Sequence, residues 1–164
     1  MSDPVTASSD GPRKGQVNPR SAARLAAVQA LYQLAMDPAQ KPPQIVAEFK
    51  AHRLGRDVDG QAYARADEAF FADLVTGTHD RLDDIDARVA PALDPAWPIH
   101  RLERLMVSIL RAATYELAVR ADVPRKVVIN EYLNVAHAFY GEKEPKFING
   151  VLETVASAAR SSDG

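Results

Sequence analysis

The feature that most constrains the fold of this chain is a series of apolar residues at helical spacing, interrupted repeatedly by proline. Recurrence at i, i+3, i+4 and i+7 places side chains on one face of an α-helix. The clearest such segment contains Leu102, Leu105, Met106, Ile109, Ala113 and Leu117. No segment alternates as a half-buried strand would, and no internal repeat is visible. The sequence therefore predicts an all-α protein.

Five other segments have helical character, and they begin at Pro19, near Gln44, near Ala62, after Asp122-Val123-Pro124 and at Pro145. The first ends before Pro38, the second near Leu54, and the third bends or breaks around Gly77 before it ends at Pro91. Asp122 is expected to accept amide hydrogen bonds at the start of the next helix, and Pro124 suits a first turn. Because that helix is apolar on more than one face, we expect it to be the central, buried one.

Length and composition favour one domain. A chain of 164 residues, 46% of them hydrophobic, can bury a sizeable core. Residues 1–18 are rich in Ser, Asp, Gly and Pro and are predicted to form a disordered tail, which leaves residues 19–160 as the helical domain.

Composition also excludes several protein classes. The chain has no cysteine, which excludes disulfides, thiolate nucleophiles and Cys-ligated zinc. It has neither a membrane-spanning apolar run nor the apolar core of a secretory signal, so a cytoplasmic protein is expected.

The net charge of −2 is unevenly distributed along the chain. Residues 1–24 carry four basic side chains against two acidic ones, and the basic residues are Arg13, Lys14, Arg20 and Arg24. Arg20 and Arg24 are four residues apart and share a helix face, where both are expected to be exposed and their guanidinium groups could bind phosphates or stack on bases. Since the whole molecule is nearly neutral, any contact with RNA must come from such a local patch together with base contacts.

Four aspartates, at positions 80, 83, 84 and 86, are the most tempting sign of an enzyme, because hard cations prefer several convergent oxygens. Helical spacing spreads them around more than half of the circumference, and Arg81 and Arg88 are available as partners. A solvated acidic helix face is therefore favoured over a Mg²⁺ site. The loop Gly55–Gly60 does not fit a calcium loop, and no two histidines show the i, i+4 spacing of a helical metal site. We predict no catalytic residue, metal or cofactor.

The last helix contains two unusual features near its start. Phe147 follows Lys146, and for that ring considered alone a place in the core is favoured over a role as a partner anchor. Asn149 and Gly150 are poor helix formers, and close packing is the favoured explanation for Gly150.

Several motifs, taken in order, resemble the NusB family of transcription antitermination factors. They are Arg20–Tyr32 with Ala-Val-Gln-Ala-Leu-Tyr, Phe71–Gly77, Ile109-Leu110-Arg111 with Tyr115-Glu116-Leu117, Val123–Glu131 and Lys146–Leu152. The resemblance covers about residues 20–157, and the combination of the last two motifs is its most specific part.

The resemblance implies an all-helical domain of about seven helices in two packed subbundles, which binds the boxA element of nascent ribosomal RNA together with NusE, a small-subunit ribosomal protein, within the RNA polymerase antitermination complex. It further implies that Arg20 and Arg24 contact RNA, that Tyr32 and Phe147 face NusE, and that Lys143 and Lys146 lie near the meeting of the two surfaces.

One departure from the family pattern matters. Ser21, Ala22 and Ala23 stand where relatives often carry a denser arginine run, so weaker intrinsic RNA affinity is expected. A protein-only scaffold without RNA binding therefore stays open as an alternative, as does self-association of the free protein. NusB-like domains also occur in RNA cytosine methyltransferases, but this chain has neither the cysteine nor the room for a Rossmann-like catalytic domain.

Overall fold

The structure of the protein is a computed structural model that describes residues 18–54 and 66–160. Within these ranges it contains seven α-helices and no strand, which confirms the all-α prediction. The helices are α1 (Pro19–Met36), α2 (Pro42–His52), α3 (Glu68–Asp80), α4 (Leu82–Val89), α5 (Arg104–Val119), α6 (Arg125–Phe139) and α7 (Lys143–Ala159). Two short 3₁₀ helices, η3 (Ala90–Ala92) and η4 (Ile99–Arg101), lie between α4 and α5. None of the helices described is long and apolar enough to cross a bilayer.

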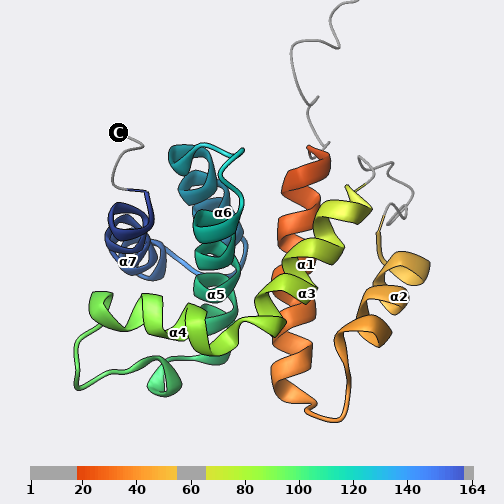
Figure 1. Ribbon diagram of the computed structural model, residues 1–164, viewed down its shortest axis with the longest axis horizontal. Helices are drawn as coiled ribbons and strands as arrows, with labels where there is room; N and C mark the ends of the chain where they lie inside the picture. Colours follow the sequence, from red (N-terminus) through yellow and green to blue (C-terminus); the bar gives the residue numbers. More distant parts are fainter. Residues whose placement is uncertain (1–17, 55–65, 161–164) are drawn as a thin grey trace, which may run out of the picture.

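The helices form two groups, as Figure 1 shows. Helices α1, α2 and α3 pack against one another, and α4 to α7 surround a second centre. Helix α1 contacts both α5 and α6, and α3 also contacts α5, so the first group is joined to the second along α1 and α3.

Helix α5, rather than α6, is the central helix of the fold. It packs against α1, α3, α4, α6 and α7, and its residues 106–110 and 112–117 are all buried. Helix α6 leaves Val127 and Phe139 exposed, and each borders a groove. The expectation that α6 is central is therefore wrong, because its second apolar face borders a groove and is not covered by another helix.

The break in the predicted third helix lies at Arg81, four residues after Gly77. Gly77 has another role: a Cβ atom there would lie 2.3 Å from Cζ of Tyr115. The close approach lets the buried Tyr115 ring pack against α3, and its hydroxyl donates a hydrogen bond of 2.7 Å to Asp73. Burial and, as the second contribution, this hydrogen bond raise the pKa of Tyr115 to about 12. The predicted start of this helix near Ala62 lies outside the described residues.

Two helix starts differ from the sequence prediction. Pro124 occupies the N-cap position of α6 without a side-chain cap, and Asp122 instead accepts hydrogen bonds from Arg120. Helix α7 begins at Lys143, so Pro145 lies inside its first turn rather than at its start. By contrast, α1 begins at Pro19 as predicted, and the side chain of Asn18 caps it by accepting from the amides of Arg20 and Ser21.

Candidate nucleic-acid interface

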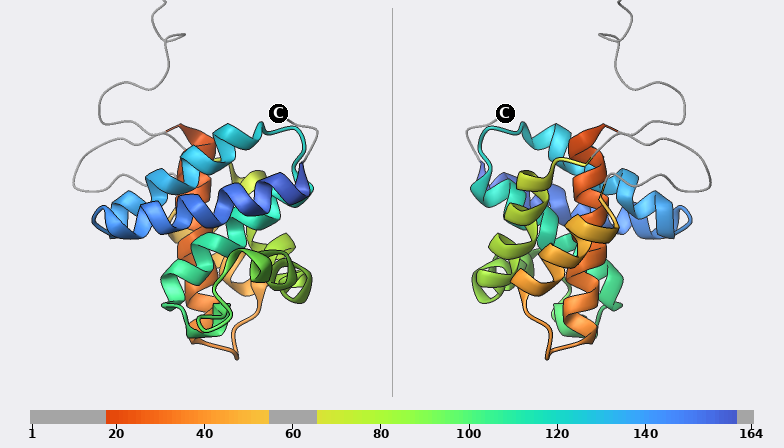
Figure 2. Two further views of the ribbon diagram at one scale, coloured as in Figure 1. Left: turned by 90° about the vertical axis from the view of Figure 1, so that its left-hand side faces the viewer. Right: turned by 90° about the vertical axis from the view of Figure 1, so that its right-hand side faces the viewer.

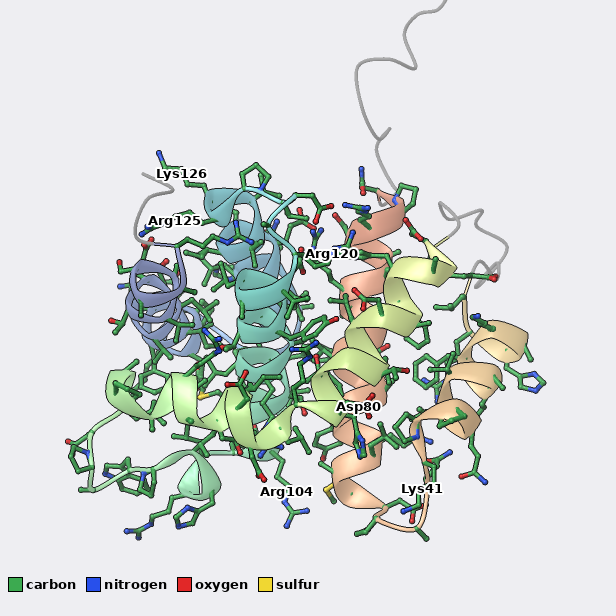
Figure 3. All side chains as sticks on the ribbon, viewed as in Figure 1. Lys41, Asp80, Arg104, Arg120, Arg125 and Lys126 are labelled. Carbon is green, nitrogen blue, oxygen red and sulfur yellow. The ribbon has the colours of Figure 1, made fainter. Side chains whose placement is uncertain are left out.

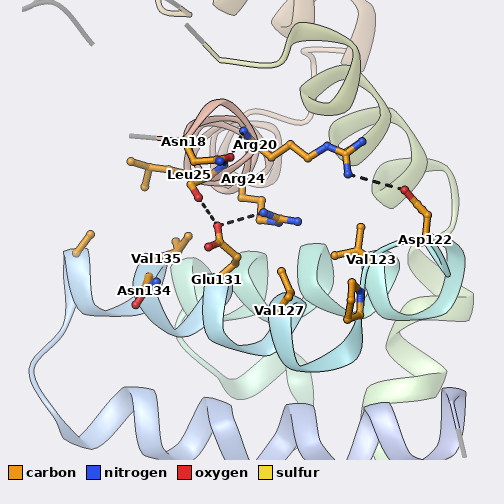
Figure 4. A pocket seen from close by; sticks show the side chains of 13 residues that line it. Asn18, Arg20, Arg24, Leu25, Asp122, Val123, Val127, Glu131, Asn134 and Val135 are labelled. Carbon is orange, nitrogen blue, oxygen red and sulfur yellow. Dashed lines mark hydrogen bonds and ion pairs between the residues drawn. The ribbon is translucent and has the colours of Figure 1, made fainter. Parts of the chain in front are cut away.

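A groove runs between the first half of α1 and the outer side of α6, and Figure 4 shows it from close by. Its lining mixes charged, amide and apolar side chains, a mixture that can contact both phosphates and bases. The lining residues are Asn18, Arg20, Ser21, Arg24, Leu25, Asp122, Val123, Pro124, Val127, Glu131, Asn134, Val135 and Ala138.

Arg20 lies at one end of this groove with 41% of its side chain exposed. Its guanidinium stacks on Phe70, with Cζ 4.5 Å from the ring centroid. Two carboxylates flank it, Asp67 with a closest N–O distance of 3.7 Å and Asp122 at 3.8 Å. Both distances exceed that of a hydrogen bond, so the Arg20 guanidinium can exchange these partners for a phosphate.

Arg24 is buried, with only 3% of its surface exposed, so the expectation that it is exposed like Arg20 is wrong. Its Nε and Nη2 donate to the two oxygens of Glu116 at 2.9 and 2.6 Å, and Nη1 donates to Glu131 at 3.1 Å. The four-residue spacing does put both arginines on one face of α1. One turn into the helix, however, that face meets α5 and α6, and Arg24 is held by their carboxylates.

The surroundings of Arg24 form a buried polar network that links α1 with α5 and α6. Glu116 is fully buried and also accepts a hydrogen bond of 3.0 Å from the hydroxyl of Tyr132, while Glu131 accepts one of 2.5 Å from Ser21. Burial alone would lower the pKa of the Arg24 guanidinium, but hydrogen bonds to Glu116 and its charge reverse this and leave the pKa raised. Burial raises the pKa of Tyr132 well above its usual value. The network keeps Arg24 charged and paired.

Sequence reasoning missed Arg120, a third arginine at the same corner. It lies at the C-terminal cap of α5, and its Cζ is 4.9 Å from the Phe70 ring that Arg20 and Arg24 also contact. It donates to both oxygens of Asp122 at 3.0 and 3.1 Å and to Asp73 at 3.0 Å. The hydrogen bonds between Arg120 and Asp122 raise the pKa of Arg120 and lower that of Asp122. No spacing in the sequence indicates that Arg120 lies near Arg20, because the two are linked through their contacts with the Phe70 ring of α3.

The corner carries more negative than positive charge. Three arginines, at positions 20, 24 and 120, face five carboxylates, those of Asp67, Asp73, Glu116, Asp122 and Glu131. Within the described residues, therefore, this is no strongly cationic patch. Arg13 and Lys14 of the predicted tail lie outside the described residues.

The remaining residues that were predicted to bind RNA lie outside this groove. Lys143 and Lys146 are exposed in the first turns of α7, and neither lines the groove. Helix α6 packs against both α1 and α7, and in the left-hand view of Figure 2 α7 lies toward the viewer with α1 behind it. The lysines thus belong to the far side of α6 from Arg20.

Phe147 is 41% exposed, so the core position favoured for it is wrong. Gly150, three residues later on the same face, is also exposed, and a Cβ atom there would meet nothing within 4 Å. Close packing within the chain therefore does not explain this glycine.

Tyr32 lines a second groove, where the C-terminal half of α1 meets the start of α5 and the end of α6. Met36 and Phe139, both exposed, supply apolar surface there. Phe147 does not line this groove, so the structure does not join the two predicted partner residues in one pocket.

Two acidic residues of α4 form ion pairs with arginines. Arg88 pairs with Asp84 at 3.2 Å, and Arg111 of α5 pairs with Asp86 at 2.8 Å. Over residues 18–54 and 66–160, no group of three or more His, Asp or Glu side chains is arranged to hold a metal ion. The exposed pair of Asp84 and Arg88 agrees with a solvated acidic face, whereas Asp86 is partly buried against α5.

Comparison with known proteins identifies the family. The model of the NusB family matches residues 21–157. The transcription antitermination protein NusB of Novosphingobium aromaticivorans is 50% identical over 142 residues, which are 86% of this chain and 95% of that protein. NusB of Sinorhizobium fredii is 45% identical over 152 residues, 93% of this chain and 94% of the relative.

Solved structures share the fold. T. maritima NusB superposes with a TM-score of 0.71 at 29% identity, covering 85% of this chain and 92% of that one. A NusB chain from a crystal structure of antitermination factors NusB and NusE in complex with dsRNA gives 0.68 at 22% identity, covering 85% and 96%. The sequence matches and the helical architecture agree, and the chain belongs to the NusB family.

Proposed function

We propose that this protein is a transcription antitermination factor that binds boxA-type single-stranded RNA in nascent ribosomal RNA transcripts together with NusE, in the cytoplasm and without catalysing a reaction. Membership of the NusB family supports the antitermination role. The observation that carries the RNA proposal is Arg20, a half-exposed, exchangeable arginine at the end of a groove with apolar and amide side chains.

Within the groove, Arg20 supplies the phosphate contact, and Arg24 acts indirectly. Arg24 has its donors engaged by Glu116 and Glu131, so we assign it to fixing α1 against α5 and α6 and thereby placing Arg20. The exposed Val127 and Asn134 of α6 offer an apolar surface and an amide to unpaired bases. Lys143 and Lys146 then bind the phosphates of RNA that continues past α6 toward the partner.

The excess of carboxylates at the corner implies that this protein alone binds RNA weakly. Electrostatic attraction supplies much of the affinity of most RNA-binding proteins, and here carboxylates offset it. NusE therefore completes the affinity in this proposal, and the assembled complex acts on RNA polymerase.

Replacing Arg20 with Ala is expected to weaken binding of boxA-type RNA about 10-fold, as the loss of one charge-assisted contact would. For wild type, three to five neutralised phosphates give a log-log salt slope of about −2 to −3.5, and R20A should reduce its magnitude by about 0.7. Fluorescence anisotropy over a salt series measures both quantities.

Arg88→Ala is the matched control for this experiment. Arg88 is as exposed as Arg20 and also pairs with an aspartate, but it lies on α4 in the other group of helices. Equal losses of RNA affinity in both variants would mean that RNA binding depends only on net charge, and this would overturn the assignment of the groove.

The proposed NusE surface on α7 rests on Phe147 and Gly150, which present an exposed ring and a bare stretch of backbone on one face. Together they allow a partner to approach the helix closely while burying an aromatic anchor. Tyr32, beside the exposed Met36 and Phe139, offers a second apolar contact.

Phe147→Ala is expected to weaken NusE binding by about 30-fold or more, because a buried aromatic anchor contributes about 2 kcal/mol or more at a hot spot. Isothermal titration with purified NusE measures the loss. RNA binding in the absence of NusE should change little, which separates this effect from that of Arg20→Ala. Val119→Ala, another exposed apolar residue, on α5, is the control. NusE affinity unaffected by Phe147→Ala would remove this face from the interface.

A further inference from the structure

Arg20 differs from the other arginines of the corner in how it is paired. Arg24 and Arg120 donate hydrogen bonds of 2.6 to 3.2 Å to carboxylates, whereas both ion pairs of Arg20 are 3.7 Å or longer. Exposed pairs of that kind contribute little to folding. Asp67 and Asp122 therefore surround Arg20 without holding it.

The two carboxylates are themselves held in place by other groups. Asp67 caps α3 by accepting from the amide of Phe70 at 3.0 Å, and its own amide donates to the Pro19 carbonyl. Asp122 receives both of its hydrogen bonds of 3.0 and 3.1 Å from Arg120. Figure 4 shows Arg20 reaching across the end of the groove toward Asp122. When a phosphate takes the Arg20 guanidinium, both negative charges stay where they are.

Fixed anions beside an exchangeable cation penalise any ligand that binds through charge alone. Two unit charges about 6 Å apart in water repel by about 0.7 kcal/mol, which corresponds to about threefold in affinity for each carboxylate. An RNA that also places bases against Val127 and Asn134 gains energy that this repulsion does not remove.

We propose that Asp67 and Asp122 compete with phosphate for Arg20 and thereby hold the affinity for every RNA below the level that charge alone would give, so that RNA without additional base contacts is not retained. The inference rests on the proposed function, since it concerns the same groove. It adds that the acidic corner works as a filter: the carboxylates lower the affinity for every RNA by a similar factor, so that at a given RNA concentration only an RNA with additional base contacts stays bound.

Asp67→Asn and Asp122→Asn test this, because each substitution removes the charge and keeps the shape. The amide oxygen introduced by the first can still cap α3, and that introduced by the second can still accept from Arg120. The probes are a boxA-type RNA and a scrambled RNA of equal length, titrated by anisotropy at low and high salt. We expect each variant to bind scrambled RNA about threefold more tightly at low salt, with the gain shrinking at high salt. The affinity for boxA-type RNA should rise by a similar factor, so the ratio of the two affinities stays about constant while the amount of scrambled RNA bound at a fixed concentration increases.

Asp84→Asn is the matched control, since Asp84 is an exposed aspartate paired with Arg88 on α4. Unchanged or weaker binding of scrambled RNA by both variants, or a gain equal to that of Asp84→Asn, would overturn the proposal. Circular dichroism identifies a variant that does not fold, and the other then decides.

Arg20→Ala in the same assay separates the two ideas. If it weakens RNA binding while the aspartate variants behave as wild type, the RNA groove stands and the filter is wrong. If Arg20→Ala has no effect, the proposed groove itself fails.

Discussion

Replacing Glu116 with Ala is expected to lower the free energy of unfolding by about 3–5 kcal/mol, since it leaves the Arg24 charge buried without its main partner. Glu116 is fully buried and accepts hydrogen bonds from both Arg24 and Tyr132, so the substitution also frees the Tyr132 hydroxyl. Equilibrium urea denaturation followed by circular dichroism measures the loss. A loss below about 1 kcal/mol would show that water enters and screens Arg24.

Two further variants separate charge from packing at this network. Arg24→Ala should cost a similar amount, because Glu116 then loses its counter-charge. The double variant Arg24→Met, Glu116→Met should recover much of the stability, since apolar residues of similar volume often replace a buried pair without loss. Glu131, which is partly exposed, keeps its hydrogen bond from Ser21 in that variant.

Arg160→Ala is expected to cost about 3 kcal/mol, although Arg160 follows the last residue of α7. Its side chain is buried and donates to the carbonyls of Leu117 at 2.8 Å, Arg120 at 2.7 Å and Glu116 at 3.2 Å, and to that of Val123. A cation at the C-terminal end of α5 also opposes the negative end of the helix dipole. Thermal unfolding at constant protein concentration gives the comparison with wild type.

Arg160→Lys should restore only part of this stability, since one ammonium cannot match the planar guanidinium that reaches several carbonyls. Arg125→Ala is the control, because Arg125 pairs with the exposed Glu153, at 3.3 Å, and its loss should cost about 1 kcal/mol or less. Equal costs for Arg160→Ala and Arg125→Ala would mean that the turn after α5 needs no support from the end of the chain.

The all-α fold could be predicted because helical spacing depends on the chain alone. The pattern from Leu102 to Leu117 corresponds to α5, and Pro19 marks the start of α1. Which helix lies at the centre depends on what covers each face, and this the pattern does not contain. For that reason α6, apolar on two faces, was a reasonable but wrong choice for the central helix.

The candidate site was predictable only in part, for the same reason. Spacing places Arg20 and Arg24 on one face of α1, but only the packing of α5 and α6 buries Arg24 and leaves Arg20 at the surface. Asp67 and Arg120 lie at the site because the start of α3 and the end of α5 come together there, with Phe70 of α3 contacting both Arg20 and Arg120. Figure 3 shows Arg120 at the same end of the molecule as the start of α1, with Arg104, at the start of α5, at the opposite end. Contacts between residues so distant in sequence leave no local signal.

The link that Arg24 makes between α1 and the carboxylates of α5 and α6 has a consequence for how ligands are received. If one group of helices slid or hinged against the other, the ion pair of Arg24 and Glu116 would be exposed or broken. The two groups of helices therefore keep a fixed relative position. In the proposed complex, the loss of conformational freedom on assembly therefore falls on the RNA and on the partner protein, and the spacing between their binding surfaces is set before either binds.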